Sequence, residues 1–187
     1  MFSRIALMAF VLLLTACQTQ QASLDFDASR DFAAYRTWAW KSPALQYRPD
    51  DPRIKSDLTE QRILQSVGDQ LEQRGLRAAQ PNAKADVLVQ AYYIVDNRQQ
   101  QISTPYGGGP WGAYWGGPWG PAYYNETRTI DYRVATLQVD LLDARDGKLV
   151  WRGSRESVVN DAPQGPTERS ASIARTVGVI MSNYPPH

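Results

Sequence analysis

Thr136-Leu-Gln-Val-Asp-Leu-Leu-Asp-Ala-Arg-Asp-Gly-Lys-Leu-Val-Trp-Arg-Gly153 is the stretch that decides the fold of this 187-residue chain. Polar and apolar side chains alternate over residues 136–141, as they do in a strand with one buried face. Residues 143–147 are rich in turn formers, and Gly147 can take the positive φ that tight turns require. Residues 148–153 then return, so the stretch predicts an antiparallel β-hairpin.

Other segments upstream of this hairpin are also typical of strands. The strand that leads into the turn begins near residue 128. Residues 87–95 are apolar at almost every position, which favours an inner strand covered on both sides. After one helical turn at residues 31–35, the run Thr37-Trp-Ala-Trp40 predicts a first strand with both tryptophans on one face. Prolines at positions 43, 49 and 52 predict a loop after it.

Two segments carry the three- and four-residue apolar spacing of amphipathic helices. The first spans residues 57–74, with Ser56 or Asp57 as its cap and Gly75 as its stop. The second runs from about residue 167 to 184. The apolar stripes are Ile63, Leu64, Val67 and Leu71 in the first helix, and Ile173, Val177, Ile180, Met181 and Tyr184 in the second. These elements predict a single α+β domain, residues 24–184, with a mostly antiparallel β-sheet and both helices packed on it.

The N-terminus has the features of an export signal. One basic residue, Arg4, precedes ten apolar residues, 5–14, which are too few to cross a bilayer. The following Leu14-Thr-Ala-Cys17 resembles the lipobox of bacterial lipoproteins. We therefore expect residues 1–16 to be a signal peptide, Cys17 to carry lipid, and residues 17–23 to form a lipidated tether. Gln18, in place of the aspartate typical of inner-membrane retention, implies the outer membrane, with the domain facing the periplasm.

Composition argues against several classes of function. The chain has 20 basic and 19 acidic residues, and removal of Arg4 balances them, so nucleic acid is not an expected partner. The only histidine is the terminal His187 and the only cysteine is Cys17, which leaves no set for Ser-His, Cys-His or transition-metal chemistry. The acids Asp140, Asp143 and Asp146 are explained as a solvated face and a turn. We expect no catalysis, no cofactor and no metal.

The second and third strands are separated by an uncharged insertion, residues 105–124. It contains seven glycines, four prolines and seven aromatic residues, a composition that excludes the interior of a regular helix or strand. Three interpretations stay open: the rings cover the domain's own surface, contact a protein, glycan or peptidoglycan partner, or lie in the membrane interface. The candidate contact residues are Tyr106, Trp111, Tyr114, Trp115, Trp119, Tyr123 and Tyr124.

Three motifs resemble the bacterial lipoproteins that carry domain of unknown function 4136. They are Asp31-Phe-Ala-Ala-Tyr-Arg-Thr-Trp-Ala-Trp40, Ala85-Asp-Val-Leu-Val89 and the hairpin motif of residues 141–153. The resemblance implies a small α+β envelope lipoprotein without an established activity, cofactor or catalytic residue. We expect the motif aromatics to fill the core, with Trp151 under a helix and Gly153 at a close approach.

Together these features predict an outer-membrane-anchored periplasmic lipoprotein that acts as a binding or scaffolding module. Its expected partners are the membrane, through the lipid on Cys17, and an envelope protein, glycan or peptidoglycan. The alternatives are a purely structural envelope component and a hydrolase with a carboxylate-based site, which would need two carboxyl groups brought together by folding.

Overall fold

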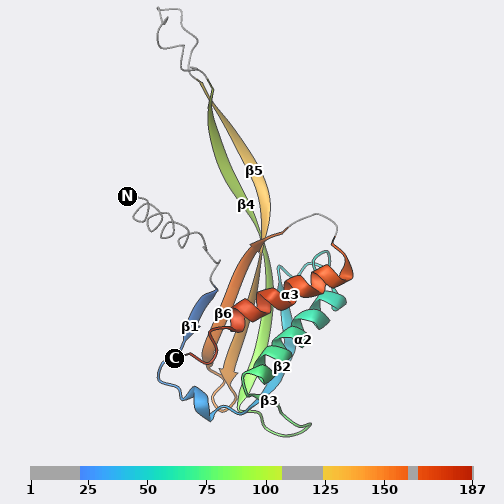
Figure 1. Cartoon of the computed structure of the whole chain (residues 1–187), viewed down its shortest axis with the longest axis vertical. Helices are drawn as coiled ribbons and strands as arrows, with labels where there is room; N and C mark the ends of the chain where they lie inside the picture. The colour runs from blue at the N-terminus through green and yellow to red at the C-terminus, as the bar shows by residue number, and fades with distance from the viewer. Residues whose placement is uncertain (1–21, 107–123, 160–163, 187) are drawn as a thin grey trace, which may run out of the picture.

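The computed structural model describes residues 22–106, 124–159 and 164–186. One mixed sheet and two helices make up this part of the chain (Figure 1). The elements in chain order are β1 (Ser23–Phe26), the short 3-10 helix η2 (Phe32–Ala34), β2 (Thr37–Arg48), α2 (Asp57–Gln73), β3 (Arg77–Ala78), β4 (Val87–Tyr106), β5 (Tyr124–Asp143), β6 (Leu149–Val158) and α3 (Pro166–Met181).

The strand order in the sheet is β1-β6-β5-β4-β2-β3. The pairs β1–β6, β6–β5 and β5–β4 are antiparallel, as expected, whereas β4–β2 and β2–β3 are parallel. The parallel pairs arise because α2 follows β2 in the chain and precedes β3 and β4. The chain therefore crosses over through α2 before β3 and β4 pair with β2. The predicted α+β fold is confirmed, and its sheet is mixed.

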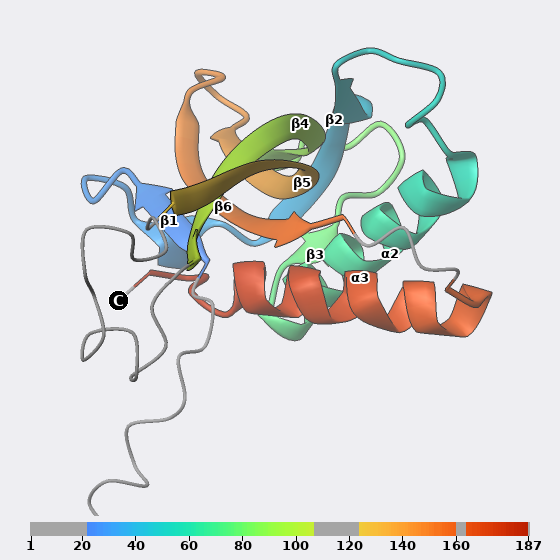
Figure 2. The ribbon, with the colours of Figure 1, turned by 90° about the horizontal axis from the view of Figure 1, so that it is seen from above.

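Both helices pack on the same face of the sheet (Figure 2). Helix α2 begins where the Ser56 hydroxyl accepts a hydrogen bond from the Thr59 amide at 3.3 Å, and it ends before Gly75, whose φ is +92°. Helix α3 begins with Pro166, which fits the first helical turn because its missing N–H needs no partner there. The Arg74 guanidinium joins the helices by donating to the Met181 carbonyl oxygen at 2.6 Å.

The core lies between the helices and this face of the sheet. Its fully buried residues include the predicted helix positions Val67, Leu71, Val177, Ile180 and Met181, together with Val87, Val89, Val139, Leu141 and Trp151 from the strands. The expected core role of the motif aromatics is confirmed: Tyr35 and Trp38 are buried, and Phe32 and Trp40 pack against the same cluster. The two tryptophans share a face, with ring centroids 5.4 Å apart.

Two sequence expectations about the strands are wrong in detail. Strand β2 continues through Pro43 to Arg48, with a register irregularity between Trp40 and Leu45 that accommodates the proline. Strand β4 has helices on one face alone. On its opposite face, Gln90 is buried because its amide donates to the Pro43 carbonyl oxygen at 3.0 Å and its own oxygen accepts from the Tyr92 hydroxyl.

Candidate functional site

The insertion predicted from the sequence is carried by a two-stranded arm. Strands β4 and β5 pair without a register shift from Val87–Asp143 to Tyr106–Tyr124. Their outer neighbours stop earlier: β2 pairs with β4 only as far as Ile94, and β6 pairs with β5 only as far as Val134. Residues 96–106 and 124–133 therefore project from the body as a ribbon (Figure 1). At about 3.4 Å per residue, the arm is about 35 Å long.

The surface of the arm is polar and largely exposed. Every side chain from Asp96 to Thr104 is exposed to solvent. Arg98 forms an ion pair with Glu156 at 2.7 Å near the base, and Arg128 forms one with Glu126 at 2.9 Å nearer the far end. A two-stranded ribbon without a packed face is marginally stable in water.

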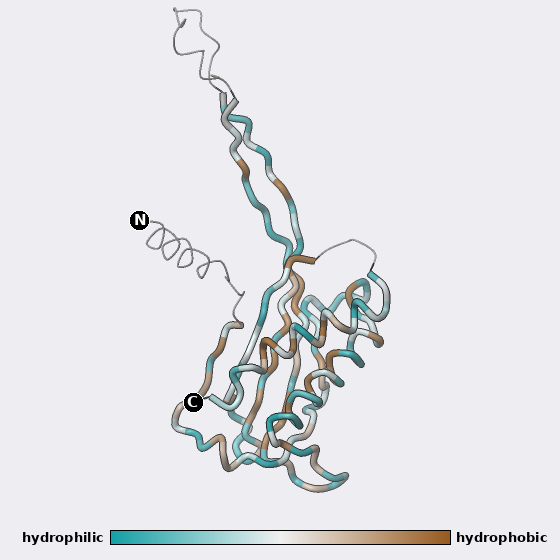
Figure 3. The backbone as a smooth tube through the Cα atoms, in the orientation of Figure 1, coloured by the Kyte–Doolittle hydropathy of each residue, from teal (hydrophilic) through white to brown (hydrophobic). Residues whose placement is uncertain are grey.

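The arm is mostly hydrophilic, with isolated hydrophobic positions along its two strands (Figure 3). Ile102 lies opposite Arg128, and Ile130 lies opposite Gln100, so all four side chains point to the same side of the ribbon. The two isoleucine side chains are 41% and 47% exposed. This face continues from the side of the sheet that the helices leave uncovered.

The predicted contact residues fall at the far end of the arm or beyond it. Tyr106 and Tyr124 form the last pair of the β4–β5 ladder. The insertion is therefore shorter than the predicted 105–124, because residues 105, 106 and 124 belong to the two strands. Trp111, Tyr114, Trp115, Trp119 and Tyr123 lie outside the described residues, as does the predicted lipidation site, Cys17.

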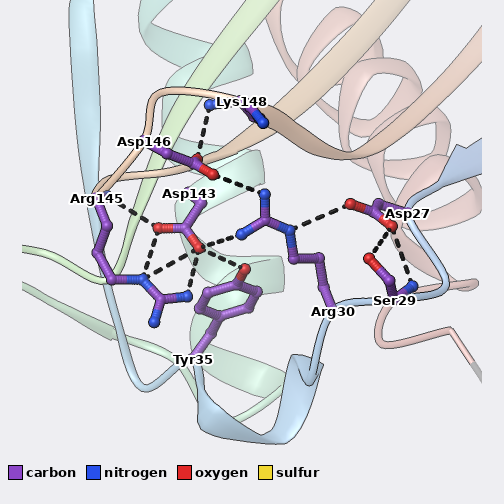
Figure 4. A network of polar contacts seen from close by, with 8 residues as sticks. All are labelled: Asp27, Ser29, Arg30, Tyr35, Asp143, Arg145, Asp146 and Lys148. Atoms are coloured by element: carbon purple, nitrogen blue, oxygen red, sulfur yellow. Dashed lines mark hydrogen bonds and ion pairs between the residues drawn. The ribbon is translucent and has the colours of Figure 1, made fainter.

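At the end of the sheet opposite to the arm, a polar network surrounds Asp143 (Figure 4). Its carboxylate is fully buried and accepts hydrogen bonds from the Tyr35 hydroxyl at 3.0 Å, Arg145 Nη2 at 2.6 Å and Arg30 Nη1 at 3.1 Å. The Arg30 guanidinium also donates to Asp27 at 3.1 Å and Asp146 at 2.7 Å. The network therefore ties the segment that follows β1 to the β5–β6 turn.

Hydrogen bonds from Arg145 and Tyr35 hold the pKa of Asp143 well below its usual range, against the opposing effect of burial. Burial, followed by the hydrogen bond to Asp143, raises the pKa of Tyr35. The sequence interpretation of the hairpin acids as solvated was wrong for Asp143 and also for Asp140, which is buried and held by Arg152 at 2.6 Å. The Asp-x-Arg spacing in the turn was the available signal.

Five of the described carboxyl groups have a pKa shifted in one direction. The pKa is lowered, not raised, for Asp27, Asp51, Asp86, Asp143 and Asp146, in each case mainly by hydrogen bonds to the carboxylate. A general acid at neutral pH needs the opposite shift. No group of three His, Cys, Asp or Glu side chains within the described ranges could hold a metal ion. None of the helices in this part of the chain has the length and apolar character needed to cross a bilayer.

The chain is similar to several known proteins. Among solved structures, the chain is similar to a PDZ domain protein from Parabacteroides distasonis, at 15% identity and a TM-score of 0.52, over 96% of this chain and 40% of that one. It is also similar to a DUF4136 family protein from Bacteroides thetaiotaomicron, at 16% identity and a TM-score of 0.49, over 88% and 95% of the two chains. No curated protein matches the sequence significantly. Residues 22–186 match the family described as "Domain of unknown function (DUF4136)", and the chain therefore belongs to that family.

Proposed function

We propose that this protein is a periplasm-facing outer-membrane lipoprotein, anchored through lipid on Cys17, that acts as a binding or scaffolding module in the cell envelope. The arm carries the proposal. It holds the start and the end of the aromatic insertion, Tyr106 and Tyr124, at a distance from the body. Its function is to present residues 107–123 to a protein, glycan or peptidoglycan partner.

Chain length favours presentation over self-covering. Residues 107–123 leave from and return to the same end of the arm, so they reach at most about nine residues, or about 30 Å, from it. The body begins about 35 Å from that end. Of the three interpretations drawn from the sequence, coverage of the domain's own core surface is therefore the least compatible with the arm.

The direction of β1 relates the arm to the proposed anchor. Because β1 is antiparallel to β6, the chain enters β1 from the end of the sheet where the arm projects. Ser23 pairs with Ser154, which pairs with Gln138, which pairs with Tyr92. From this level, β4 continues for fourteen residues to the far end of the arm, about 46 Å. The tether from Cys17 to Ser23 spans at most about 20 Å.

A tether this short favours an arm that lies inclined along the membrane that holds the lipid, because an upright arm would reach about 46 Å from the level of Ser23 and the tether at most about 20 Å. With the arm pointing away, the tether would have to reverse and pass the lower half of the sheet. We therefore expect the partner to lie close to the membrane surface. The charges of the arm, three acidic and three basic, balance, which fits recognition by rings and hydrogen bonds better than binding of a polyanion.

The presentation role is tested by replacing residues 107–123 with Asn-Gly, a two-residue turn that closes a hairpin and keeps the arm. A second variant changes Trp111, Trp115 and Trp119 to alanine. The intact protein and both variants are crosslinked in whole envelopes and sedimented with purified peptidoglycan. We expect both variants to lose a partner that the intact chain holds. Equal capture by all three proteins would contradict the proposed role of the insertion.

The anchor is tested separately with Cys17→Ser. The intact chain should incorporate labelled palmitate and fractionate with outer membranes, whereas the variant should do neither, because several acyl chains on one residue are needed for stable anchoring. Recovery of unlabelled intact protein in the soluble periplasmic fraction would refute the anchor and leave the partner experiment unaffected.

A further inference from the structure

The outer edge of β4 in the arm is a long, regular and unpaired strand edge. Strand β2 pairs with β4 as far as Ile94, and no other strand in the described part of the chain takes its place from residue 96 to 106. The β4–β5 ladder has no bulge over this length. Every second residue therefore presents a free N–H and C=O outward, a template to which another strand can add.

The two edges of the arm differ in how they are protected. Charged side chains, proline and bulges are the usual devices that prevent pairing at an exposed edge. Strand β5 has charges along the part of it that lies beyond β6, at Glu126, Arg128 and Asp131. Residues 99–104 of β4, Gln-Gln-Gln-Ile-Ser-Thr, contain no charge, no proline and no glycine. The middle of the β4 edge, between Arg98 and Pro105, is therefore the part of the arm that is most open to pairing.

We propose that the free edge of β4 pairs antiparallel with the same edge of a second copy of this chain, about a two-fold axis at Gln101. Such an axis, normal to the sheet, places one residue opposite its own copy. Residues 96–106 are symmetric about Gln101, so this register aligns the whole free edge with itself and sets Pro105, which cannot donate a hydrogen bond, near its end opposite Asn97. A shift of the axis to Ile102 would set Pro105 against the interior position 99, where it could not donate a hydrogen bond.

Side chains along this register are compatible. Asp96 lies opposite Tyr106 of the second copy and Arg98 opposite Thr104, so no like charges meet across the new pair. The two-fold axis also brings the same face of both arms together. Ile102 of each copy then lies opposite Gln100 of the other, and the exposed isoleucines gather on one side of a four-stranded sheet.

Single cysteines test this arrangement in the full-length protein. Gln101→Cys places a thiol on the proposed axis, where the two Cβ atoms lie about 5 Å apart. Its matched control is Thr129→Cys, because Thr129 lies directly opposite Gln101 on β5 and is equally exposed. In the proposed dimer, the two copies of residue 129 are separated by three strand spacings, about 14 Å, which is beyond disulfide reach. Cys17 is present in every sample, so the unmodified chain controls for it.

We expect mild oxidation of envelopes to give a disulfide dimer with Gln101→Cys at a yield at least about tenfold above that of Thr129→Cys. The register predicts a second result. Chains with Gln99→Cys and chains with Ser103→Cys should crosslink with each other when mixed, and each much less when alone. Equal yields at positions 101 and 129, no dimer at position 101 despite a thiol that reacts with maleimide, or a crosslink from position 101 to a different protein would overturn the proposal.

Discussion

Replacement of Gly153 by alanine is the most direct test of the packing in the hairpin motif. A methyl group at this position would lie 2.5 Å from Trp151 Cη2 and 2.8 Å from Ile180 Cγ2. Ordinary carbon–carbon contacts are about 3.5–4 Å, so each neighbour must move by about 1 Å. Both are fully buried, one on the same strand and one on α3.

Overpacking of this kind costs about 1–3 kcal/mol, and two rigid neighbours place Gly153→Ala at the upper end. The loss of glycine freedom in the unfolded chain offsets about 0.5–1 kcal/mol of that cost. We expect a net loss of about 2 kcal/mol in the free energy of unfolding, measured by urea titration with tryptophan fluorescence and an unchanged m-value.

Gly178→Ala is the matched control. Gly178 lies within α3, and apart from its chain neighbours and the backbone of its own helix no atom lies within 4 Å of an added methyl group, so the helix preference for alanine should stabilise the protein by up to about 1 kcal/mol. If Gly153→Ala unfolds at the same or a higher urea concentration than the unmodified protein, the close approach of Trp151 and Ile180 does not constrain this position and the reasoning is wrong.

Two further predictions concern polar contacts. Asp143→Asn should lower stability at pH 7 by about 2 kcal/mol, less than for a fully enclosed pair because Arg145 is largely exposed. Because the folded-state pKa of Asp143 is depressed, the unmodified protein should lose this contribution to stability as the pH falls below about 4. The variant should show a flatter dependence of stability on pH in the acid range. Parallel curves for the two proteins would contradict this prediction. Ser56→Ala removes the cap of α2 and should cost about 1 kcal/mol in urea unfolding, and an unchanged midpoint would show that the 3.3 Å contact contributes nothing.

Elements whose periodicity is set by the core could be predicted from the sequence. The turn before Gly147, which has a φ of +70°, and the stripe from Ile63 to Leu71 both follow from local patterns that one buried face imposes. The family could also be recognised from the hairpin motif of residues 141–153. Trp151 and Gly153 of this motif meet under α3, and the packing there constrains both residues.

Features set by tertiary contacts could not be predicted in the same way. Nothing local to residues 37–48 indicates that β2 pairs in parallel with β4 or that a strand tolerates Pro43. Asp143 appeared to be a turn residue because its partners Arg30 and Tyr35 are more than a hundred positions away in the chain. The arm was only partly predicted, since residues 96–106 have no buried face to impose an alternation of polar and apolar side chains.

The core nevertheless determines where the arm presents its edge. A shift of one residue between β4 and β5 would turn either Val89 or Val139, both fully buried, to the opposite face of the sheet. The ladder continues from those residues to Tyr106 and Tyr124 without a bulge, so the register in the arm is the register of the core. The outward groups at Gln101, about 40 Å from Val89, are therefore placed by packing under the helices. A surface that must meet an identical copy residue for residue requires such a fixed register, and an unbroken ladder supplies it.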